Sequence, residues 1–547
     1  MKLALRYFSL FLLLACSLEL SAQKRSLEID DYFSIKSLQS PRISPDGKWV
    51  AWLQRESLFK EEKSETSLWM RSLEGGEALR MTAKGSSVSQ PRWSPDGKYL
   101  SFVANRNESK SQVWGLNRQG GEAQQLTKVK QGINGYEWAP DGKSLLLSIR
   151  EEAPKDPKAK KGKKDSPKPW VIDRLQFKRD YAGYLDTLHT HLYVQGLGDT
   201  ALTQLTFGDF DASQARWSPD GSQVAFVSNR TDNPDGNSNT DIWLLNLDDP
   251  KALTQLTTNP GSDYGPSWSP DGKSIAYITV TQPEIIWYAS NHLALLSVEG
   301  KKSKVLTQKL DRNISNINFS ADGLSLFFEL EDSGESQLAR MSLKGGKIER
   351  LIKGNDILRD YALGPNGNIC ALISKADLPG DIFLYRPNGM QQLTEVNKTL
   401  LDSLSLVSVE ARTFKSKDGA EIEGFFYKPL GFEEGKKYPT LLRIHGGPVA
   451  QYTSAFNFEA QLFAAKGYLV IMTNPRGSSG YGQDFSLAIF QDWGKKDFED
   501  VMAGVDLAIE MGWADPDRLG VGGWSYGGIL TNYVITQTER FHAAISG

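Results

Sequence analysis

The sequence predicts an N-terminal all-β domain, a seven-bladed β-propeller, followed by an incomplete α/β domain. Three observations support this. A short hairpin motif with a Ser-Pro-Asp-Gly turn, or a close variant of it, recurs seven times before residue 396. Apolar strands then alternate with helical segments, as they do in parallel α/β sheets. A G-x-S-x-G motif centred on Ser525 lies near the end of the 547-residue chain. This length exceeds that of a single domain.

The first residues have the three parts of a secretory signal peptide. Lys2 and Arg6 give a positive start, Leu10–Ala15 form a short apolar core, and Ser21–Ala22 are small residues before a cleavage point. The apolar run is too short to span a bilayer. We therefore expect residues 1–22 to be a signal peptide and the mature protein to be periplasmic or secreted. Residues 23–36 are then an N-terminal extension.

A second processing route is less favoured. The stretch ending at Cys16 resembles a bacterial lipobox, which would make the protein a lipoprotein, but Leu14 fits that pattern poorly. The other cysteine is Cys370, so the mature chain would hold no internal disulfide. No later segment is long and apolar enough to be transmembrane. A net charge of −3 gives no overall field that would favour nucleic acid.

The repeated hairpin explains the first domain. Its first copy is ISPDGKWVAWL from Ile43 and its second is WSPDGKYLSFV from Trp93. Proline fixes φ in the turn, Asp favours the turn, and glycine supplies the positive φ that returns the chain to a strand. The repeat glycines are Gly47, Gly97, Gly142, Gly221, Gly272, Gly323 and Gly367.

Each hairpin is followed by a second strand–turn–strand unit, as in LWMRSLEGGEALRMT. Most of these units end in a threonine: Thr82, Thr127, Thr206, Thr257, Thr307 and Thr394. The sixth unit lacks it. Four strands per repeat, at a usual spacing of 44–51 residues between the repeat glycines, are typical of propeller blades. We predict a seven-bladed propeller over residues 37–396, with TolB-like repeats.

The spacing fails once, between Gly142 and Gly221, where about residues 151–190 are inserted. The Lys/Pro-rich first part is expected to be a disordered surface loop. It lacks the interleaved aromatic residues of a nucleic-acid site. The later part, from Trp170 onward, is aromatic and is expected to be ordered and to line the propeller face that meets the second domain.

Residues 397–547 have the pattern of a parallel α/β sheet. PTLLRIHGGP is a buried strand that runs into a glycine loop, and DRLGVGGWSYGGILTNYVITQ is a strand, a tight turn and a helix. Ser525 lies in that turn, which is the context that a nucleophile elbow requires. The helix start behind Ser525 places positive partial charge near a developing oxyanion. One oxyanion donor is then the N–H of Tyr526, and the HGGP loop can present another.

Taken together, these motifs resemble the prolyl oligopeptidase family of serine peptidases, in the branch of acylaminoacyl-peptidases and related dipeptidyl peptidases. The motifs are HGGP at 445–448, NPRGSSGYG at 474–482, DWG at 492–494, DPDRLGV from Asp515, and GWSYGG at 523–528. The resemblance implies an α/β-hydrolase domain in which Ser525 is the nucleophile and the N–H groups of Gly447 and Tyr526 form the oxyanion hole. It implies oligopeptide substrates, no metal or organic cofactor, and a propeller that gates access. It also allows a homo-oligomer.

The partners of Ser525 are harder to find. In an α/β-hydrolase the acid and the base follow the serine, but no Asp follows Ser525 and the only later histidine is His542. His542 is expected to be a core or surface residue, and His445 a residue that shapes its loop. We therefore expect a chain truncated after the nucleophile elbow. Without a base, such a chain should be inactive, and its unpaired apolar strand should make it poorly soluble.

Two other functions remain open at this stage. The same elbow serves esterases and lipases, although a large propeller suits peptide gating. The propeller could also be a binding module attached to a non-functional hydrolase remnant. Two glutamate pairs, Glu61–Glu62 and Glu151–Glu152, could hold a substrate amino group, but their Lys-rich surroundings indicate solvated loop charges. The sequence does not decide between exopeptidase and endopeptidase action.

Overall fold

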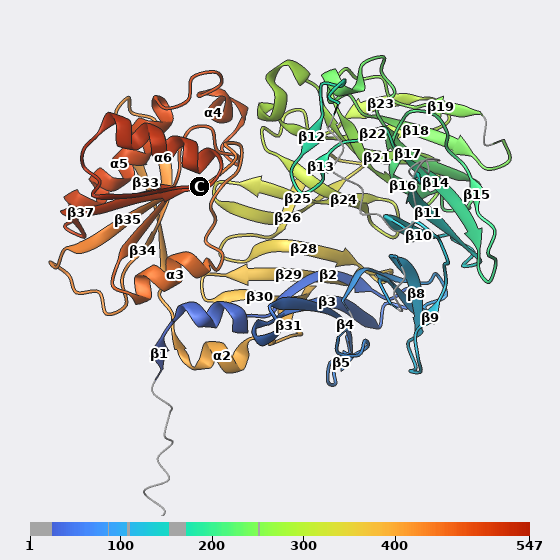
Figure 1. Ribbon diagram of the computed structural model, residues 1–547, viewed down its shortest axis with the longest axis horizontal. Coiled ribbons are helices and arrows are strands. Elements are labelled where there is room, and N and C mark those ends of the chain that lie inside the picture. The colour runs from blue at the N-terminus through green and yellow to red at the C-terminus, as the bar shows by residue number, and fades with distance from the viewer. Residues whose placement is uncertain (1–23, 86, 107–109, 153–170, 250–251) are drawn as a thin grey trace, which may run out of the picture.

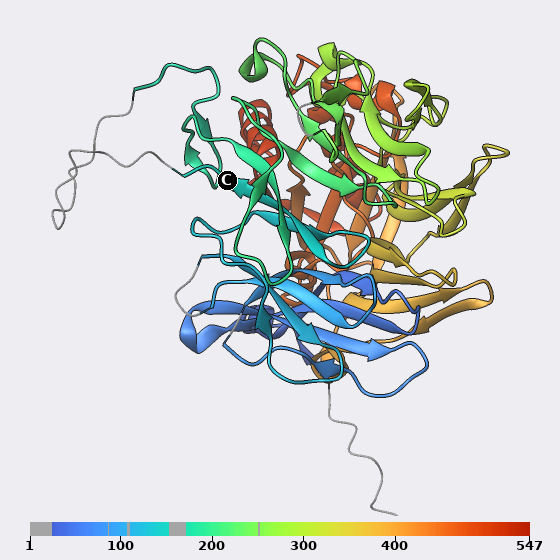
Figure 2. The ribbon, with the colours of Figure 1, turned by 90° about the vertical axis from the view of Figure 1, so that its right-hand side faces the viewer.

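The computed structural model describes residues 24–85, 87–106, 110–152, 171–249 and 252–547. The predicted signal peptide, Cys16 and most of the Lys/Pro-rich insert lie outside these residues. Within them the chain forms a propeller and an α/β domain that stand side by side (Figure 1). Figure 2 looks onto the propeller from the side away from the α/β domain and shows the blades arranged around a centre.

The propeller consists of seven four-stranded sheets between Ser37 and Gln392, which confirms the predicted architecture. Neighbouring strands within each sheet are antiparallel. The strands of the seven blades are, in order, β2 (Ser37–Ile43), β3 (Trp49–Leu58), β4 (Lys63–Ser72), β5 (Leu79–Arg80); β6 (Val88–Trp93), β7 (Tyr99–Ala104), β8 (Gln112–Asn117), β9 (Gln124–Gln125); β10 (Gly135–Trp138), β11 (Ser144–Arg150), β14 (Thr190–Gly196), β15 (Thr203–Gln204); β16 (Ser213–Trp217), β17 (Gln223–Ser228), β18 (Asp241–Asn246), β19 (Leu253–Gln255); β20 (Asp263–Trp268), β21 (Ser274–Val280), β22 (Asn291–Ser297), β23 (Lys302–Val305); β24 (Ile314–Phe319), β25 (Ser325–Asp332), β26 (Glu335–Ser342), β27 (Ile348–Ile352); β28 (Ile357–Leu363), β29 (Ile369–Lys375), β30 (Leu378–Arg386), β31 (Gly389–Gln392).

The Ser-Pro-Asp-Gly turn is fixed by its own side chains. In the second blade the Ser94 hydroxyl donates a hydrogen bond of 2.5 Å to Asp96 and accepts one of 2.9 Å from the N–H of Tyr99. Asp96 also accepts the N–H of Lys98 at 3.0 Å. The same pattern recurs in the first, fourth, fifth and sixth blades. Local side-chain hydrogen bonds of this kind therefore account for the repeated motif.

The closing threonine of each repeat has an equally specific role. The Thr127 hydroxyl accepts a hydrogen bond of 2.9 Å from the N–H of Val113, on the neighbouring strand of its blade. The threonines at 82, 206, 257, 307 and 394 accept an equivalent backbone N–H. The sixth blade lacks this threonine, and there the pairing of β26 with β27 changes register between Leu338 and Ala339. The hydroxyl thus satisfies a buried donor at the end of a ladder.

The predicted N-terminal extension ties the two domains together. β1 (Arg25–Ser26) pairs in parallel with β32 (Leu404–Ser405), and η1 (Ile29–Ser34) follows it. The Asn397 side chain, just before α2 (Lys398–Asp402), accepts the N–H of Lys36 and donates to its carbonyl, both at 2.8 Å. The chain therefore enters and leaves the propeller at one hydrogen-bonded point.

The α/β domain is built on a six-stranded sheet in the order β33–β34–β36–β35–β37–β38. β33 and β34 form an antiparallel hairpin, and the last four strands are parallel. The elements are β33 (Val409–Lys415), β34 (Glu421–Tyr427), β35 (Tyr438–Ile444), α3 (Phe458–Ala465), β36 (Leu469–Asn474), α4 (Gln483–Leu487), α5 (Lys496–Glu510), β37 (Ala514–Gly523), α6 (Tyr526–Gln537) and β38 (Ala543–Ser546).

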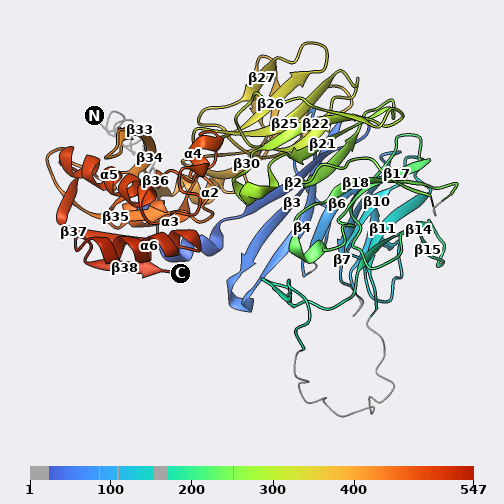
Figure 3. The same ribbon diagram turned by 90° about the horizontal axis from the view of Figure 1, so that it is seen from above.

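Helices α5 and α6 pack against the sheet (Figure 3). Their apolar side chains form one core with those of β34, β35, β36 and β37. The predicted α/β pattern is thus confirmed. The core extends into the propeller, because Tyr288 from η4 (Pro283–Tyr288) belongs to the same cluster. β38 is the edge strand of the sheet, and all four of its residues are exposed.

Candidate functional site

Ser525 occupies a sharp turn between β37 and α6. It caps the N-terminus of α6 with φ 57° and ψ −124°, a conformation that residues other than glycine rarely adopt. Trp524 before it is 75% exposed, and Ser525 itself is exposed, whereas Tyr526 after it is buried. A strained strand-to-helix turn that presents one serine outward is the geometry of a nucleophile elbow.

The two glycines of the motif are required by close packing. A methyl group at Gly523 would lie 2.4 Å from the backbone of Gly527, and one at Gly527 would lie 2.3 Å from the carbonyl oxygen of Ile444. Larger residues would therefore push α6 away from the ends of β35 and β37.

The HGGP loop, which follows β35, lies against the elbow. A methyl group at Gly446 would stand 3.5 Å from Cβ of Ser525. Gly447 is exposed, with φ +123°, and its N–H has no hydrogen-bond partner among the described residues. The N–H of Tyr526 is the first of α6 and has no partner within the helix. The structure therefore places the loop that carries Gly447 beside Ser525 and the start of α6.

His445 shapes this loop. Its Nδ1 lies 2.7 Å from the carbonyl oxygen of Gly446, and its Nε2 lies 2.9 Å from the hydroxyl of Ser478. Burial lowers the pKa of His445, which favours the neutral ring. The Ser478 hydroxyl in turn donates a hydrogen bond of 2.6 Å to the carbonyl oxygen of Pro475. Both nitrogens are thus engaged away from Ser525.

The described residues give Ser525 no base. No side chain in the described part of the chain hydrogen-bonds to its Oγ. His542 is exposed, precedes β38, and uses its backbone N–H to bond the carbonyl of Leu519 at 2.9 Å. The described site therefore holds an elbow and two candidate oxyanion donors, without a hydrogen-bonded imidazole.

A buried polar group behind the elbow was not assigned a role from the sequence. The Tyr526 hydroxyl donates to the carboxylate of Asp497, which is fully buried and also accepts the N–H of Gly494. Burial raises the pKa of Asp497. The ring of Trp493 packs edge-on against Tyr526 with centroids 5.0 Å apart. The DWG motif at 492–494 was the signal in the sequence, but only the structure connects it to the elbow.

Two cavities lie on the propeller, and one of them reaches the α/β domain. One, of about 680 Å³, is lined by Ile286 and Trp287 of the propeller and by Val449, just after the HGGP loop. The other, of about 730 Å³, extends over the propeller face and is lined by Arg92, Glu137 and Arg216 among others. Gln176 and Asp235 line both cavities, so they adjoin each other.

The ordered part of the insert lies on this face of the propeller, as expected. It contains the short strands β12 (Lys178–Arg179) and β13 (Gly183–Tyr184). Arg174 forms two hydrogen bonds with the carboxylate of Asp235, of 2.9 and 2.5 Å. Gln176, two residues on, shares a cavity with Val449 of the α/β domain. The insert therefore faces the second domain.

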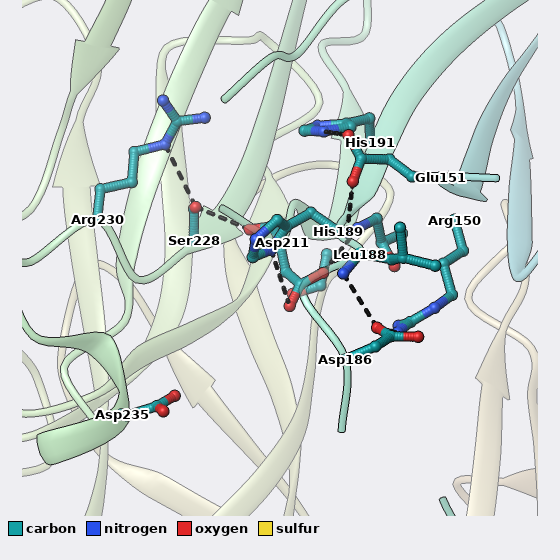
Figure 4. A network of polar contacts seen from close by, with 12 residues as sticks. Arg150, Glu151, Asp186, Leu188, His189, His191, Asp211, Ser228, Arg230 and Asp235 are labelled. Carbon is teal, nitrogen blue, oxygen red and sulfur yellow. Dashed lines mark hydrogen bonds and ion pairs between the residues drawn. The ribbon is translucent and has the colours of Figure 1, made fainter. Parts of the chain in front are cut away.

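A polar network lies at the end of the insert (Figure 4). Glu151 accepts the N–H of His189 at 2.9 Å and lies 3.3 Å from Nε2 of the buried His191. Asp211 accepts the N–H of Thr190 at 2.7 Å. Glu151 is thus exposed, with 40% of its side chain accessible, as expected, but it also has specific partners. It holds the start of β14 in place.

The described residues contain no group of three or more His, Cys, Asp or Glu side chains arranged to hold a metal ion. None of their helices has the length and apolar character needed to cross a membrane.

Comparison with known proteins gives one family match, two relatives and one solved structure. Residues 454–547 match the family model described as the prolyl oligopeptidase family. An uncharacterized peptidase, YuxL, of Bacillus subtilis is 30% identical over 542 residues, which cover 96% of this chain and 82% of the relative. Dipeptidyl-peptidase 5 of Porphyromonas gingivalis is 29% identical over 541 residues, covering 94% and 77%. The solved acylaminoacyl peptidase of Pyrococcus horikoshii superposes with a TM-score of 0.81 at 24% identity, covering 95% of this chain and 78% of that one, which supports the fold.

Proposed function

The chain belongs to the prolyl oligopeptidase family of serine peptidases, and from that premise we propose that Ser525 is its nucleophile in the hydrolysis of short peptides. The N–H groups of Gly447 and Tyr526 are the proposed oxyanion hole. The observation that carries the proposal is the approach of the HGGP loop to the elbow, where a methyl group at Gly446 would lie 3.5 Å from Cβ of Ser525.

The proposed reaction is acyl transfer in two steps. Oγ of Ser525 attacks the carbonyl carbon of the scissile peptide bond, and its proton passes to a base. The carbonyl oxygen becomes an oxyanion, and the N–H groups of Gly447 and Tyr526 are proposed to stabilise it by hydrogen bonding as the charge develops. The C–N bond then breaks and the amine leaves with a proton. Water hydrolyses the resulting ester at Ser525 and releases the peptide acid.

The cavities support short substrates. A space of about 680 Å³ beside the HGGP loop accommodates a few residues but no folded protein. Its exposed Ile286 and Trp287 offer apolar contact to a substrate side chain. The name of the Porphyromonas gingivalis relative supports release of dipeptides as the first cleavage to assay. We propose that the propeller gates access to this space.

The proposed destination is the periplasm or the cell exterior. Support comes from the N-terminal sequence alone, in which a positive start, an apolar core and small residues follow in order.

The 547-residue chain by itself is proposed to be inactive or very slow, because no described side chain takes the proton from Ser525. A serine hydroxyl without a base is a weak nucleophile. The same observation favours a second candidate function, in which the propeller binds peptides and the α/β domain does not turn them over.

A fluorophosphonate probe and a substrate panel separate these functions. Dipeptidyl anilides, longer peptide anilides and p-nitrophenyl esters are each incubated with the 547-residue chain, with and without imidazole as an external base. Slow covalent labelling at Ser525 that imidazole accelerates supports the peptidase. Peptide binding without any labelling of Ser525 supports the binding module. Anilide turnover without imidazole, lost in Ser525→Ala, contradicts the proposed inactivity.

A further inference from the structure

We propose that the propeller holds both halves of the oxyanion hole in position. On the Tyr526 side the contact is made by Tyr288 of the propeller, and on the Gly447 side the propeller binds Gln451 of the α/β domain. Tyr288 and Gln451 are positioning residues, since neither is placed to touch a substrate carbonyl. The inference rests on the proposed function, because it assigns Gly447 and Tyr526 as the donors.

The first connection starts at Tyr288, the last residue of η4 in the fifth blade. The indole Nε1–H of Trp493 donates a hydrogen bond of 2.8 Å to the hydroxyl of Tyr288. The Trp493 ring then lies edge-on to the ring of Tyr526, at 5.0 Å and an angle of 77°. Tyr288 and Tyr526 are both almost fully buried, at 3% and 2% exposure. Trp493 thus contacts both Tyr288 of the propeller and the side chain of Tyr526, whose backbone N–H is a proposed oxyanion donor.

The tyrosine at the elbow is held from its other end as well. Its hydroxyl donates to Asp497, whose carboxylate accepts the N–H of Gly494 at 2.8 Å and of Phe498 at 3.0 Å. A methyl group at Gly494 would lie 2.3 Å from the ring of Tyr533 on α6. The turn that carries Trp493 is therefore packed on the elbow helix, and a shift of Trp493 would be transmitted to Tyr526.

The second connection reaches the HGGP side. Gln451, four residues after Gly447, accepts the N–H of Gly334 at 3.0 Å and donates to the carbonyl of Glu335 at 2.8 Å. Gly334 and Glu335 form the tip of the β25–β26 hairpin in the sixth blade. The neighbouring Ser333 donates its N–H to the carbonyl of Gly480 at 2.8 Å. The loop that presents the Gly447 N–H is therefore tied to the propeller by both ends of one amide.

The propeller loop that bears Tyr288 is itself strained. Ile286 has φ 49° and ψ −129°, which is unfavourable for a β-branched residue. This conformation directs Tyr288 into the core of the α/β domain, while Ile286 and Trp287 remain 46% and 58% exposed beside the cavity. Strain of this kind persists only where the surroundings fix it, and here the surroundings include the elbow.

The test needs a reaction rate that depends on the oxyanion hole but not on a catalytic base. Ser525→Cys supplies a thiol that ionises at about pH 9. Its acylation by p-nitrophenyl acetate passes through an oxyanion, whereas its alkylation by iodoacetamide does not. The ratio of the acylation rate to the alkylation rate therefore measures how well the oxyanion hole stabilises the oxyanion. Cys16→Ser is included in every variant, and the buried Cys370 stays unreactive because burial raises the pKa of its thiol to about 12.

Tyr288→Phe removes only the acceptor hydroxyl, and Gln451→Met removes both hydrogen bonds at similar length. We expect each to lower the acylation-to-alkylation ratio about fivefold to tenfold, less than the loss of a whole donor, with alkylation unchanged. Trp493→Phe should match Tyr288→Phe, and the pair should not add. The matched control is Gln461→Ala, which breaks an interdomain hydrogen bond of 3.1 Å to Ala376 and two hydrogen bonds to Val407 but touches neither donor. Its ratio should stay within about twofold.

Two results count against the inference. If the parent thiol shows a higher ratio than N-acetylcysteine, but Tyr288→Phe and Gln451→Met leave that ratio unchanged, the hole exists and the propeller does not position it. If the parent ratio is no higher than that of N-acetylcysteine, the hole is absent, and both the inference and the proposed site are wrong.

Discussion

The backbone of Gly446 comes so close to the elbow that a methyl group on it would lie 3.5 Å from Cβ of Ser525 and 3.2 Å from the carbonyl oxygen of Trp524. The loops that follow two neighbouring strands, β35 and β37, thus come into contact at Ser525. This approach is possible only because both loops are rich in glycine. It gives the site a geometry that single substitutions can test.

Gly447→Ala should impair the oxyanion hole. The added methyl group would lie 2.8 Å from the N–H nitrogen of Val449, and the φ of +123° is unfavourable for alanine. The loop must shift, so its N–H should move away from the oxyanion. We expect acylation of the Ser525→Cys thiol to fall about tenfold to a hundredfold, measured by nitrophenolate release. Gly345→Ala, which has no atom within 4 Å, is the control and should change nothing. An unchanged rate in Gly447→Ala would remove this residue from the hole.

Gly523→Ala should destabilise the α/β domain rather than merely slow a reaction. Its methyl group would lie 2.4 Å from the backbone of Gly527 and 2.7 Å from the carbonyl oxygen of Ile444, and backbone atoms cannot move aside cheaply. We expect a loss of about 3 kcal/mol or more, seen in calorimetry as an earlier unfolding transition for this domain. The propeller transition should stay where it is. If Gly523→Ala unfolds at the same temperatures as the wild-type chain, the elbow tolerates a side chain at this position.

The propeller should become more stable at neutral pH when Asp263 is neutralised. Its side chain is fully buried, and burial raises its pKa from 3.8 to about 6. The folded state therefore keeps a proton between about pH 4 and pH 6 that the unfolded chain has released. Stability from this group is present below pH 4 and is lost as the pH rises through 6. Asp263→Asn should raise the unfolding free energy by about 2 kcal/mol at pH 8 and by little at pH 4.

Asp96 provides a control of opposite sign. Hydrogen bonds from Ser94 and from the N–H of Lys98 lower the pKa of Asp96. Asp96→Asn should therefore weaken the propeller at pH 7 and have a smaller effect at pH 3. Thermal unfolding of both variants across this pH range checks the pair. Equal shifts at all pH values for Asp263→Asn would contradict the assignment of a buried, protonated carboxyl.

The edge of the α/β sheet should promote self-association of this chain. All four residues of β38 are exposed, and Ile545 is 71% exposed. An apolar edge strand with free N–H and C=O groups pairs readily with a second copy. Ile545→Lys should lower the aggregated fraction in light scattering several-fold. Val171→Lys adds the same charge at a residue 83% exposed on the propeller insert, and should not help. Equal solubility for both variants would point to net charge instead of the edge.

Much of the fold could be predicted because local chemistry repeats. The Ser94–Asp96 turn and the Thr127 hydroxyl act within a few residues or one blade, so their motifs are visible in the sequence. The elbow was predictable for the same reason: Gly523, Ser525 and Gly527 are adjacent.

Other features depend on contacts between distant segments. Tyr288 and Trp493 are 205 residues apart in sequence, and neither residue type by itself indicates the other. Glu151 was assigned to a solvated loop from its neighbours, but its partner His191 lies beyond a long insert. Pairings of this kind follow from the tertiary structure, which a single sequence without relatives does not reveal.

The most direct test of the account is where an activated peptidyl ester attaches to this chain. The chain is incubated with the ester, with and without imidazole, digested with trypsin and analysed by mass spectrometry. We predict an acyl group on Ser525, in the peptide 519–540, formed faster with imidazole and absent from Ser525→Ala. Acyl groups only on surface lysines and tyrosines, with Ser525 unmodified in the presence of imidazole, would contradict the proposal that Ser525 is a nucleophile in a formed oxyanion site.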